Sequence, residues 1–302
     1  MANSIEVILN ARSGSRETAD SRTVVERVFG SSGRSFGISV ASGDEIGRVA
    51  QEKAQSNCEV LVAAGGDGTV CGVAESARKF NKTLGVLPLG TFNYFAKNLG
   101  IPLDLEEACR VTLDGAPVRA SVLDLDGRLV LNNTSIGIHP AALVQRRKLY
   151  RRWGRNQLNA YLSVLLTAFQ PPPRMRVRLA TDEGEVLRET PLVMVCSNAF
   201  QMETFGLAGK ECLAAGKFAL YVARMGGRAT ICRLGLRTVL RCLRPEIDYE
   251  VICTSDVTIE TLRRRSFRAA VDGELERLES PLRIRVAPQQ LCVLAPQERS
   301  NG

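Results

Sequence analysis

Residues 60–69 read Val-Leu-Val-Ala-Ala-Gly-Gly-Asp-Gly-Thr, an apolar run that ends in glycines. Such a run is typical of a fully buried strand, and residues 70–80 after it follow a helical pattern. Consecutive glycines between a strand and a helix let the backbone approach a phosphate group, because no Cβ is in the way and the helix N-terminus offers free N–H donors. The alternative interpretation is a glycine-rich turn whose helix is capped by Thr69.

The same alternation of apolar runs and helical patterns extends on both sides of this stretch. We expect strands at 5–9, 36–40, 60–64 and 84–87, and helices at 17–29, 44–55, 70–80 and 91–98. Strands that alternate with helices indicate βαβ units. The sequence therefore predicts a doubly wound α/β domain over residues 1–122.

The pattern changes after residue 122. Short apolar runs follow one another closely, many separated by Gly, Asp or Pro, with helical stretches at 140–169 and 228–243. This density of short strands predicts an antiparallel β-sandwich over residues 123–287. One further apolar run, 291–294, lies in the tail 288–302.

Composition narrows the class of protein. Of the 302 residues, 45% are hydrophobic and 24% are charged, which excludes a disordered tail, a collagen-like repeat or a coiled coil. The formal net charge of +8 favours a polyanionic partner such as phosphates, an anionic membrane surface or nucleic acid. His139 is the single histidine, which argues against a poly-histidine metal site, and we interpret it as structural.

Cysteine spacing and hydropathy point to a cytoplasmic protein. The nine cysteines are scattered without a C-x-x-C pair, so we expect reduced thiols that pack in the core. The N-terminal residues lack the features of a signal peptide. The longest apolar helical stretch, 158–169, is too short to cross a bilayer core of about 30 Å.

Two further loops follow strands of the same predicted sheet. One reads Pro-Leu-Gly-Thr-Phe-Asn-Tyr-Phe-Ala at 88–96, and the other reads Asn-Ala-Arg-Ser-Gly at 10–14. The carboxyl ends of parallel strands meet at one sheet edge, where α/β proteins bind their ligands. The chain contains neither G-x-G-x-x-G nor G-x-x-x-x-G-K-[ST], which disfavours Rossmann dehydrogenases and P-loop NTPases.

Together with Val-Asp-Gly-Glu at 271–274, the loops at 65–69 and 88–96 resemble the catalytic-domain family of the diacylglycerol kinases. This family includes bacterial soluble lipid kinases and the sphingosine and ceramide kinases. The resemblance implies an N-terminal ATP-binding domain and a C-terminal β-sandwich that binds lipid, with the active site in the cleft between them. It also implies that the last strand returns to the first domain. The expected reaction transfers the γ-phosphoryl group of Mg-ATP to a lipid hydroxyl, so ATP and Mg²⁺ are the expected cofactors.

The resemblance also assigns residues. The family's nucleotide-binding positions fall on Asn10, Ser39, Gly65, Gly66, Asp67, Gly68, Thr69 and Thr91. Asp67 is in addition a candidate catalytic residue and the expected ligand of the nucleotide's Mg²⁺. The family draws its general base from the carboxylates that correspond to Asp272 and Glu274, because the attacking hydroxyl has to lose its proton. Residues i and i+2 of a strand share a face, so we expect these two carboxylates to point the same way.

Three departures from the family pattern keep other functions open. Cys71 and Gly72 replace a common Asn and Glu, Ala11 replaces a Pro, and Ala215 with Lys217 replaces an Asp-Gly that helps to hold a structural Mg²⁺. These changes motivate the alternative of a catalytically weakened regulator that binds lipid or nucleotide. A NAD kinase-like enzyme is a second alternative, because it shares G-G-D-G-T, although the other two motifs argue against it.

Basic residues cluster before the apolar stretch 158–169. The cluster comprises Arg146, Arg147, Arg151 and Arg152 with Trp153 beside them, and Lys148, Tyr150 and Arg155 extend it. Arginines interleaved with aromatic residues suit an anionic membrane surface, from which a peripheral lipid kinase would take its substrate. The alternative is a solvated charged face. Arg263, Arg264, Arg265 and Arg268 form a second patch, and no nucleic-acid-binding module accompanies either one. The sequence leaves the oligomeric state open.

Overall fold

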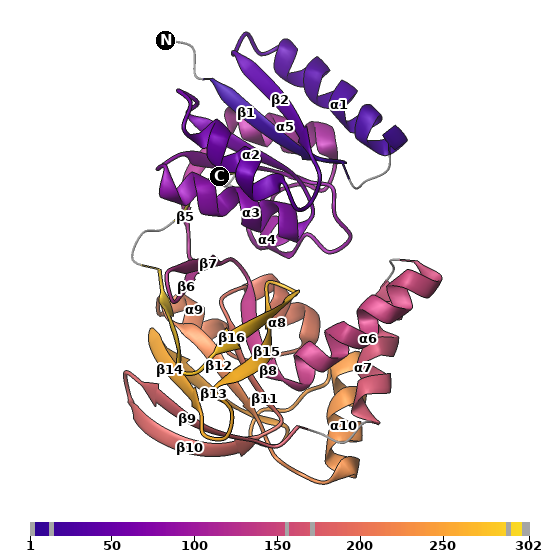
Figure 1. Cartoon of the computed structure of the whole chain (residues 1–302). Coiled ribbons are helices and arrows are strands. Elements are labelled where there is room, and N and C mark those ends of the chain that lie inside the picture. Colours follow the sequence, from indigo (N-terminus) through magenta and orange to yellow (C-terminus); the bar gives the residue numbers. More distant parts are fainter. Residues whose placement is uncertain (1–3, 12–14, 155–156, 170–172, 288–290, 298–302) are drawn as a thin grey trace, which may run out of the picture. The chain divides into compact units, whose positions relative to one another are not determined.

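The computed structural model describes residues 4–11, 15–154, 157–169, 173–287 and 291–297 (Figure 1). The chain forms two compact units. Unit 1 comprises residues 1–122 and 287–302, and unit 2 comprises residues 123–286.

Unit 1 is built on a six-stranded sheet in the order β2-β1-β3-β4-β18-β5. Its strands are β1 (Ile5–Asn10), β2 (Phe36–Ala41), β3 (Val60–Gly65), β4 (Thr83–Pro88), β5 (Ala116–Ala120) and β18 (Leu291–Ala295). All six residues of β3 are buried, which explains its continuous apolar run. The parallel pairing of β2, β1, β3 and β4 confirms the predicted parallel sheet.

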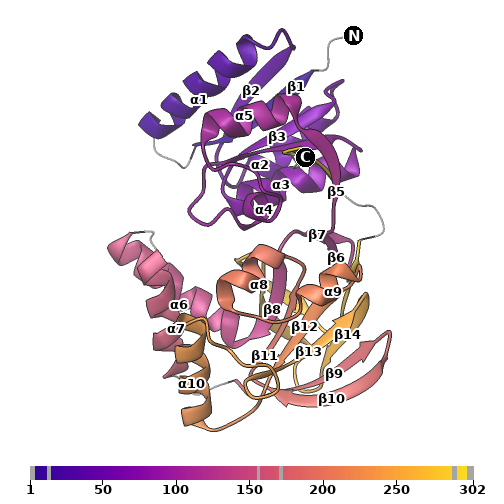
Figure 2. The same cartoon turned by 180° about the vertical axis from the view of Figure 1, so that it is seen from behind.

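Helices cover both faces of this sheet, as a doubly wound fold requires. They are α1 (Ser15–Gly30), α2 (Ile46–Ala54), α3 (Asp67–Lys79), α4 (Tyr94–Asn98) and α5 (Leu105–Asp114). Helices α2 and α3 pack together on one face, and α1 and α5 pack together on the other (Figures 1 and 2). Strand β18 inserts between β4 and β5, parallel to the first and antiparallel to the second. The chain thus returns from unit 2 to complete this sheet.

Unit 2 contains two antiparallel six-stranded sheets. The first, in the order β10-β9-β14-β17-β6-β7, consists of β6 (Leu123–Leu125), β7 (Arg128–Val130), β9 (Met175–Thr181), β10 (Gly184–Thr190), β14 (Asp256–Thr261) and β17 (Leu282–Val286). The second, in the order β13-β12-β11-β8-β15-β16, consists of β8 (Asn133–Gly137), β11 (Leu192–Cys196), β12 (Phe218–Ala223), β13 (Tyr249–Thr254), β15 (Ser266–Val271) and β16 (Glu274–Glu279). Side chains from both sheets, such as Leu179 and Ile284 from the first and Val195 and Leu220 from the second, form one buried cluster. This confirms the predicted sandwich.

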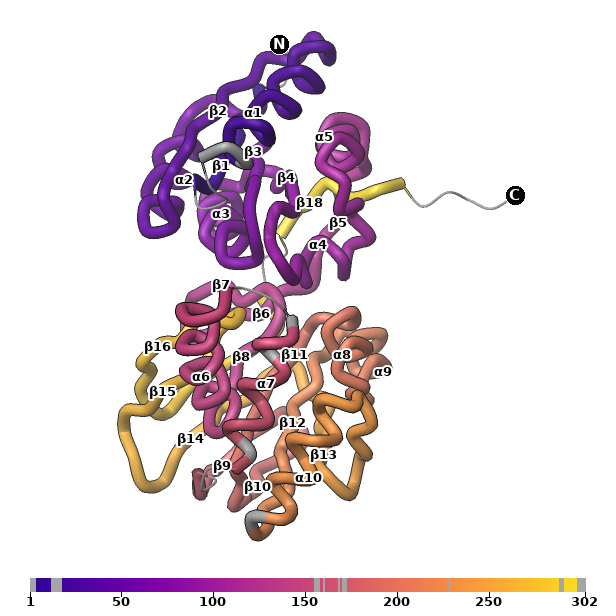
Figure 3. The backbone as a smooth tube through the Cα atoms, turned by 90° about the vertical axis from the view of Figure 1, so that its right-hand side faces the viewer, coloured from indigo at the N-terminus to yellow at the C-terminus, as the bar shows by residue number. Residues whose placement is uncertain are grey.

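The described part of unit 2 also contains five helices. They are α6 (Ile138–Trp153), α7 (Gln157–Ala168), α8 (Ala199–Phe205), α9 (Lys210–Ala214) and α10 (Arg228–Val239). Helix α6 packs on β8, β15 and β16, while α7 lies beside α6 and next to α10 (Figure 3). Asn159 of α7 contacts the end of α6, since its Nδ2 donates to the carbonyl of Gly154 at 2.9 Å. Within the described residues, no helix combines the length and hydropathy needed to cross a bilayer.

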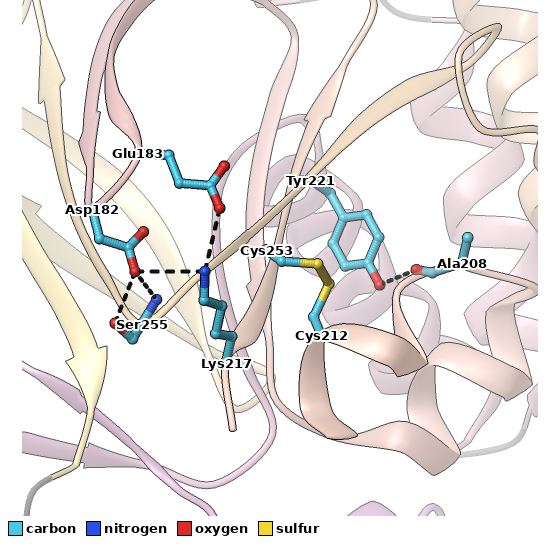
Figure 4. The surroundings of a disulfide bond; sticks show 8 residues. All are labelled: Asp182, Glu183, Ala208, Cys212, Lys217, Tyr221, Cys253 and Ser255. Atoms are coloured by element: carbon cyan, nitrogen blue, oxygen red, sulfur yellow. Dashed lines mark hydrogen bonds and ion pairs between the residues drawn. A yellow bond between two sulfur atoms is a disulfide. The ribbon is translucent and has the colours of Figure 1, made fainter. Parts of the chain in front are cut away.

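The expectation that every cysteine is a reduced thiol is wrong for two of them. Cys212 of α9 and Cys253 of β13 form a disulfide beside Tyr221 (Figure 4). The two residues are 41 positions apart, so their sequence spacing could not reveal the pair. The fold brings them together because α9 packs against the apolar side of β12 and β13.

This assignment predicts a thiol count. All nine cysteines lie in the described part of the chain, and seven of them are free. Titration of the denatured, unreduced protein with a thiol reagent should therefore give seven reactive groups, and titration after reduction should give nine. A Cys253→Ser variant is the control, and it should give eight thiols without reduction. Nine thiols in the unreduced wild type would contradict the bond.

Candidate functional site

Two glycine loops of unit 1 touch through their backbones at the carboxyl ends of β3 and β4. The N–H of Leu89 donates to the carbonyl of Gly65 at 3.0 Å. A Cβ atom on Gly90 would lie 2.4 Å from the Cα of Gly66, a distance at which no side chain fits. Glycine is therefore required for steric reasons where the loops cross.

The first strand joins this arrangement through Asn10. Its Nδ2 donates to the Oγ1 of Thr69 at 2.7 Å, which links the end of β1 to the first turn of α3. Gly66, not Thr69, is the N-cap residue of α3, and no side chain caps this helix. The capping role that the alternative interpretation gave to Thr69 is therefore wrong. Residues 12–14 of the first loop lie outside the described residues.

Asp67 is the first residue of α3, and its carboxylate turns toward the loop after β4. The Oδ1 atom accepts a hydrogen bond from the backbone N–H of Phe95 at 3.2 Å. Burial raises the pKa of the Asp67 carboxyl above its ordinary value, while the amides of Phe95, Tyr94 and Asn93 act in the opposite direction. Loss of solvation and hydrogen bonding to these amides therefore act in opposite directions on the Asp67 carboxyl, and loss of solvation is the larger effect.

The sequence did not single out Asn93, which shapes the loop after β4. Its backbone is left-handed, with φ at 52°, and its side chain both accepts from the N–H of Gly90 at 2.9 Å and donates to the carbonyl of Gly90 at 2.8 Å. The motif letters P-x-G-T-x-N contain this residue, and they were the only clue to its role.

The other predicted nucleotide-binding residues lie at or near the same sheet edge. Thr91 and Gly68 are exposed. Ser39 is half-buried in edge strand β2, where it pairs in register with Ile8 of β1. The structure thus brings Asn10 into contact with the segment 65–69 through Thr69. Ser39, in contrast, lies two strands away from β3.

The V-D-G-E motif of unit 2 forms a tight hairpin. Val271 and Glu274 pair as the last and first residues of β15 and β16, and Asp272 and Gly273 form the two-residue turn with φ at 47° and 83°. Positive φ at both turn positions is the geometry for which an Asp-Gly turn is best suited.

The carboxylate of Asp272 is fully engaged with backbone. It accepts from the N–H of Leu131 at 2.8 Å, of Asn132 at 2.7 Å and of Asn133 at 3.1 Å. All three of these residues are buried, so the amides have no access to bulk water. Asp272 therefore fixes the segment that leads into β8.

Glu274 points elsewhere and pairs with a helix. Its Oε2 lies 2.6 Å from a guanidinium nitrogen of Arg147 in α6, and both side chains are more than half exposed. The expectation that Asp272 and Glu274 share a direction is wrong, because Asp272 belongs to the turn and the two-residue period holds only inside a strand. Arg147 was predicted as a membrane residue, and nothing in the sequence identified it as the partner of Glu274.

The structure describes the surroundings of two family departures. A Cβ atom on Gly72 would lie 3.1 Å from Cγ2 of Ile46, so a side chain at this position would require Ile46 to shift by a few tenths of an ångström. Lys217 places its ammonium 3.2 Å from Glu183 and 4.0 Å from Asp182 (Figure 4). In the described chain, no three His, Cys, Asp or Glu side chains are grouped closely enough to hold a metal ion.

The raised pKa of Asp67 predicts a pH-dependent stability effect. The folded carboxyl keeps its proton to a higher pH than the unfolded one, so ionised Asp67 lowers the free energy of unfolding at neutral pH and this cost disappears in acid. We therefore expect the difference in free energy of unfolding between Asp67→Asn and the wild type to favour the variant more at pH 7 than at pH 3.5. Urea unfolding at both pH values measures this difference. Asp114→Asn, an exposed change in the same unit, is the control. An equal difference at both pH values for Asp67→Asn would contradict the burial argument.

Asp272 and Glu274 should differ sharply in their effect on stability. An asparagine at 272 has one acceptor oxygen for three buried N–H groups, so Asp272→Asn should lower the free energy of unfolding by about 1–3 kcal/mol. Glu274→Gln disrupts only an exposed ion pair and should change it by less than about 1 kcal/mol. Urea unfolding of both variants checks this, and similar losses would show that the carboxylates have equivalent roles.

Comparisons with known proteins agree with this layout. Residues 4–125 match the family model described as the diacylglycerol kinase catalytic domain. A probable lipid kinase YegS-like protein from Klebsiella pneumoniae is 37% identical over 97 residues, or 32% of each chain. A diacylglycerol kinase from Staphylococcus saprophyticus is 34% identical over 104 residues, or 32% of this chain and 33% of the relative. These alignments thus span about a third of the relatives' length.

Solved structures extend the likeness in fold to nearly the whole chain. A crystal structure of a diacylglycerol kinase from Bacillus anthracis matches with a TM-score of 0.70 and 18% identity over 97% of both chains. A second structure from that organism matches with a TM-score of 0.77 and 19% identity over 97% of this chain and 95% of the other. Residues 4–125 are thus similar to the diacylglycerol kinase catalytic domain, and nearly the whole chain shares its fold with these solved structures.

Proposed function

We propose that this protein is an ATP-dependent lipid kinase, which transfers the γ-phosphoryl group of Mg-ATP to the hydroxyl of a diacylglycerol-like lipid. The observation that carries the proposal is the pair of glycine loops in backbone contact at the uncapped N-terminus of α3. A helix N-terminus without a capping side chain has free N–H donors, and glycine loops beside it leave space for phosphates.

Unit 1 would bind the nucleotide. In the proposal, the phosphates lie against the backbone of Gly66 and Gly68, and Asn10 and Thr69 hold the loops together through their hydrogen bond. A single carboxylate, Asp67, fits a magnesium ion that arrives with the nucleotide, because Mg²⁺ commonly takes one or two protein carboxylates and completes its shell with phosphate and water. When bound, this ion would neutralise charge on the phosphates that react.

Unit 2 would supply the general base. Glu274 has an exposed carboxylate that is ion-paired with an exposed arginine, and in the proposal this carboxylate accepts the proton of the lipid hydroxyl group. Arg147 would position that carboxylate. Asp272 uses both of its oxygens on backbone amides, so we assign it the role of a positioning residue that shapes the turn before Glu274.

Helices α6 and α7 would bring the enzyme to its lipid. Trp153 is 55% exposed, Leu158 is 74% exposed and Phe169 is 75% exposed, and Arg151 and Arg152 are exposed beside Trp153. Exposed apolar side chains next to arginines suit an anionic membrane surface. Arg147 has its partner in Glu274, and Arg155 lies outside the described residues, so the proposed contact centres on Arg151, Arg152 and Trp153.

A phosphoryl-transfer assay tests the proposal. The protein is incubated with γ-labelled ATP and a mixed lipid extract, in detergent micelles and in vesicles, with and without Mg²⁺. We expect a labelled lipid that requires Mg²⁺. Glu274→Gln should lower turnover at least about tenfold, which corresponds to ~1.4 kcal/mol in the barrier, because the hydroxyl then lacks its proton acceptor.

Glu279→Gln at the far end of β16 is the matched control and should retain wild-type turnover. Wild-type turnover of Glu274→Gln would refute the assignment of the base while leaving the kinase proposal in place. Label on NAD instead of lipid would favour the NAD kinase-like alternative. Nucleotide binding with no labelled acceptor would favour the regulator.

A further inference from the structure

The outer end of the β15–β16 hairpin carries a hollow that the proposed reaction does not use. Its volume is about 550 Å³, and three arginines line it, namely Arg264, Arg268 and Arg277. Phe267 and Leu275 add apolar surface to the wall. A hollow of this size is within the range of small-molecule sites.

The positive charges in this hollow face one another across the sheet. Arg268 and Arg277 are direct partners in the antiparallel register of β15 and β16. Like charges at directly opposed positions destabilise a strand pair, so this arrangement costs stability in the absence of an anion. A guanidinium keeps its charge at any physiological pH, so the repulsion cannot be relieved by loss of a proton.

Nearby carboxylates do not neutralise these arginines. Glu276 lines the hollow but forms an ion pair with Arg128 of β7. Arg277 donates from Nε to the hydroxyl of Ser266 at 2.8 Å, which fixes the orientation of its guanidinium. Among the described residues, no carboxylate lies within ion-pair distance of Arg264, Arg268 or Arg277.

We propose that this hollow is a binding site for a phosphate group, carried either by a small soluble molecule or by a lipid headgroup. Guanidinium groups bind phosphate oxygens through paired N–H donors, and an anion placed between Arg268 and Arg277 would convert their repulsion into attraction. The site does not depend on the kinase proposal, because none of its residues belongs to the loops of unit 1 or to the Asp272–Glu274 turn.

Hydrogen exchange on the full-length protein tests the site with a local readout. Backbone exchange of residues 263–279 is followed with inorganic phosphate, with phosphatidylcholine vesicles that contain phosphatidic acid, and with phosphatidylcholine alone. We expect phosphate-dependent protection of this hairpin in the wild type. In Arg268→Ala/Arg277→Ala, the phosphate concentration for half-protection should rise at least about tenfold, because two charge-assisted contacts are lost.

Controls separate this site from other anion-binding surfaces. Arg119→Ala removes an exposed strand arginine of unit 1 and should leave protection of the hairpin unchanged. Phosphate bound at the glycine loops would protect residues 65–69 and 88–96, not the hairpin. Should the double alanine variant fold poorly, Arg268→Lys/Arg277→Lys keeps the charge and should weaken binding by loss of the paired donors.

The two arms identify the source of the phosphate. Protection by inorganic phosphate alone assigns a soluble ligand, protection by phosphatidic acid vesicles alone assigns a lipid headgroup, and protection by both assigns a site open to either. Absence of hairpin protection in both arms, or equal protection in wild type and the double alanine variant, would overturn the proposal.

Discussion

The crossing of two backbones, at Gly66 and Gly90, is the constraint on which the arrangement of unit 1 depends. A Cβ atom on Gly90 would meet the Cα of Gly66 at 2.4 Å, so the loops after β3 and β4 can come this close only without side chains. The close approach places the Asp67 carboxylate within reach of the Phe95 amide. The N-terminus of α3 at this crossing has no capping side chain, and the proposed phosphate binding depends on this feature.

Three carboxylates that looked alike in the sequence have different physical roles. Asp67 is half-buried, and its carboxylate accepts a hydrogen bond from the backbone amide of Phe95. Asp272 accepts hydrogen bonds from three backbone amides and holds the entry to β8 in place. Glu274 stays exposed in an ion pair with Arg147, and it is the residue proposed here as the general base. The three roles differ because desolvation, hydrogen bonding and ion pairing affect each carboxylate to a different extent.

The positive charge of the chain also divides by environment. Arg147 is committed to Glu274 and Arg128 to Glu276. Arg151 and Arg152 are exposed beside Trp153, where the proposed membrane contact lies. Arg268 and Arg277 lie opposite each other in the strand pair, and no carboxylate of the described residues is within ion-pair distance of either one. The net charge of +8 is therefore spread over several surfaces whose arginines lie in different environments.

The sequence by itself determined the two architectures and the three motifs. Apolar runs such as 60–64 and the helical periods between them are local patterns, and local patterns record whether a strand or a helix buries one face or both. Glycines at 65, 66 and 90 likewise mark places where a backbone needs room. The residues of the candidate site were therefore visible, although their contacts were not.

Only the tertiary structure decided the contacts made across long separations. These include the disulfide between Cys212 and Cys253, the pairing of Glu274 with Arg147 and the engagement of Asp272 by residues 131–133. The turn at Asp272 illustrates the reason. The two-residue period of a strand predicted that Asp272 and Glu274 share a face. Asp272 instead has φ at 47° and lies in the turn, so its carboxylate points in another direction. Periodicity fixes which face a residue takes inside an element. The partner that a side chain meets is set by how separate elements pack, and that information is spread over the whole chain.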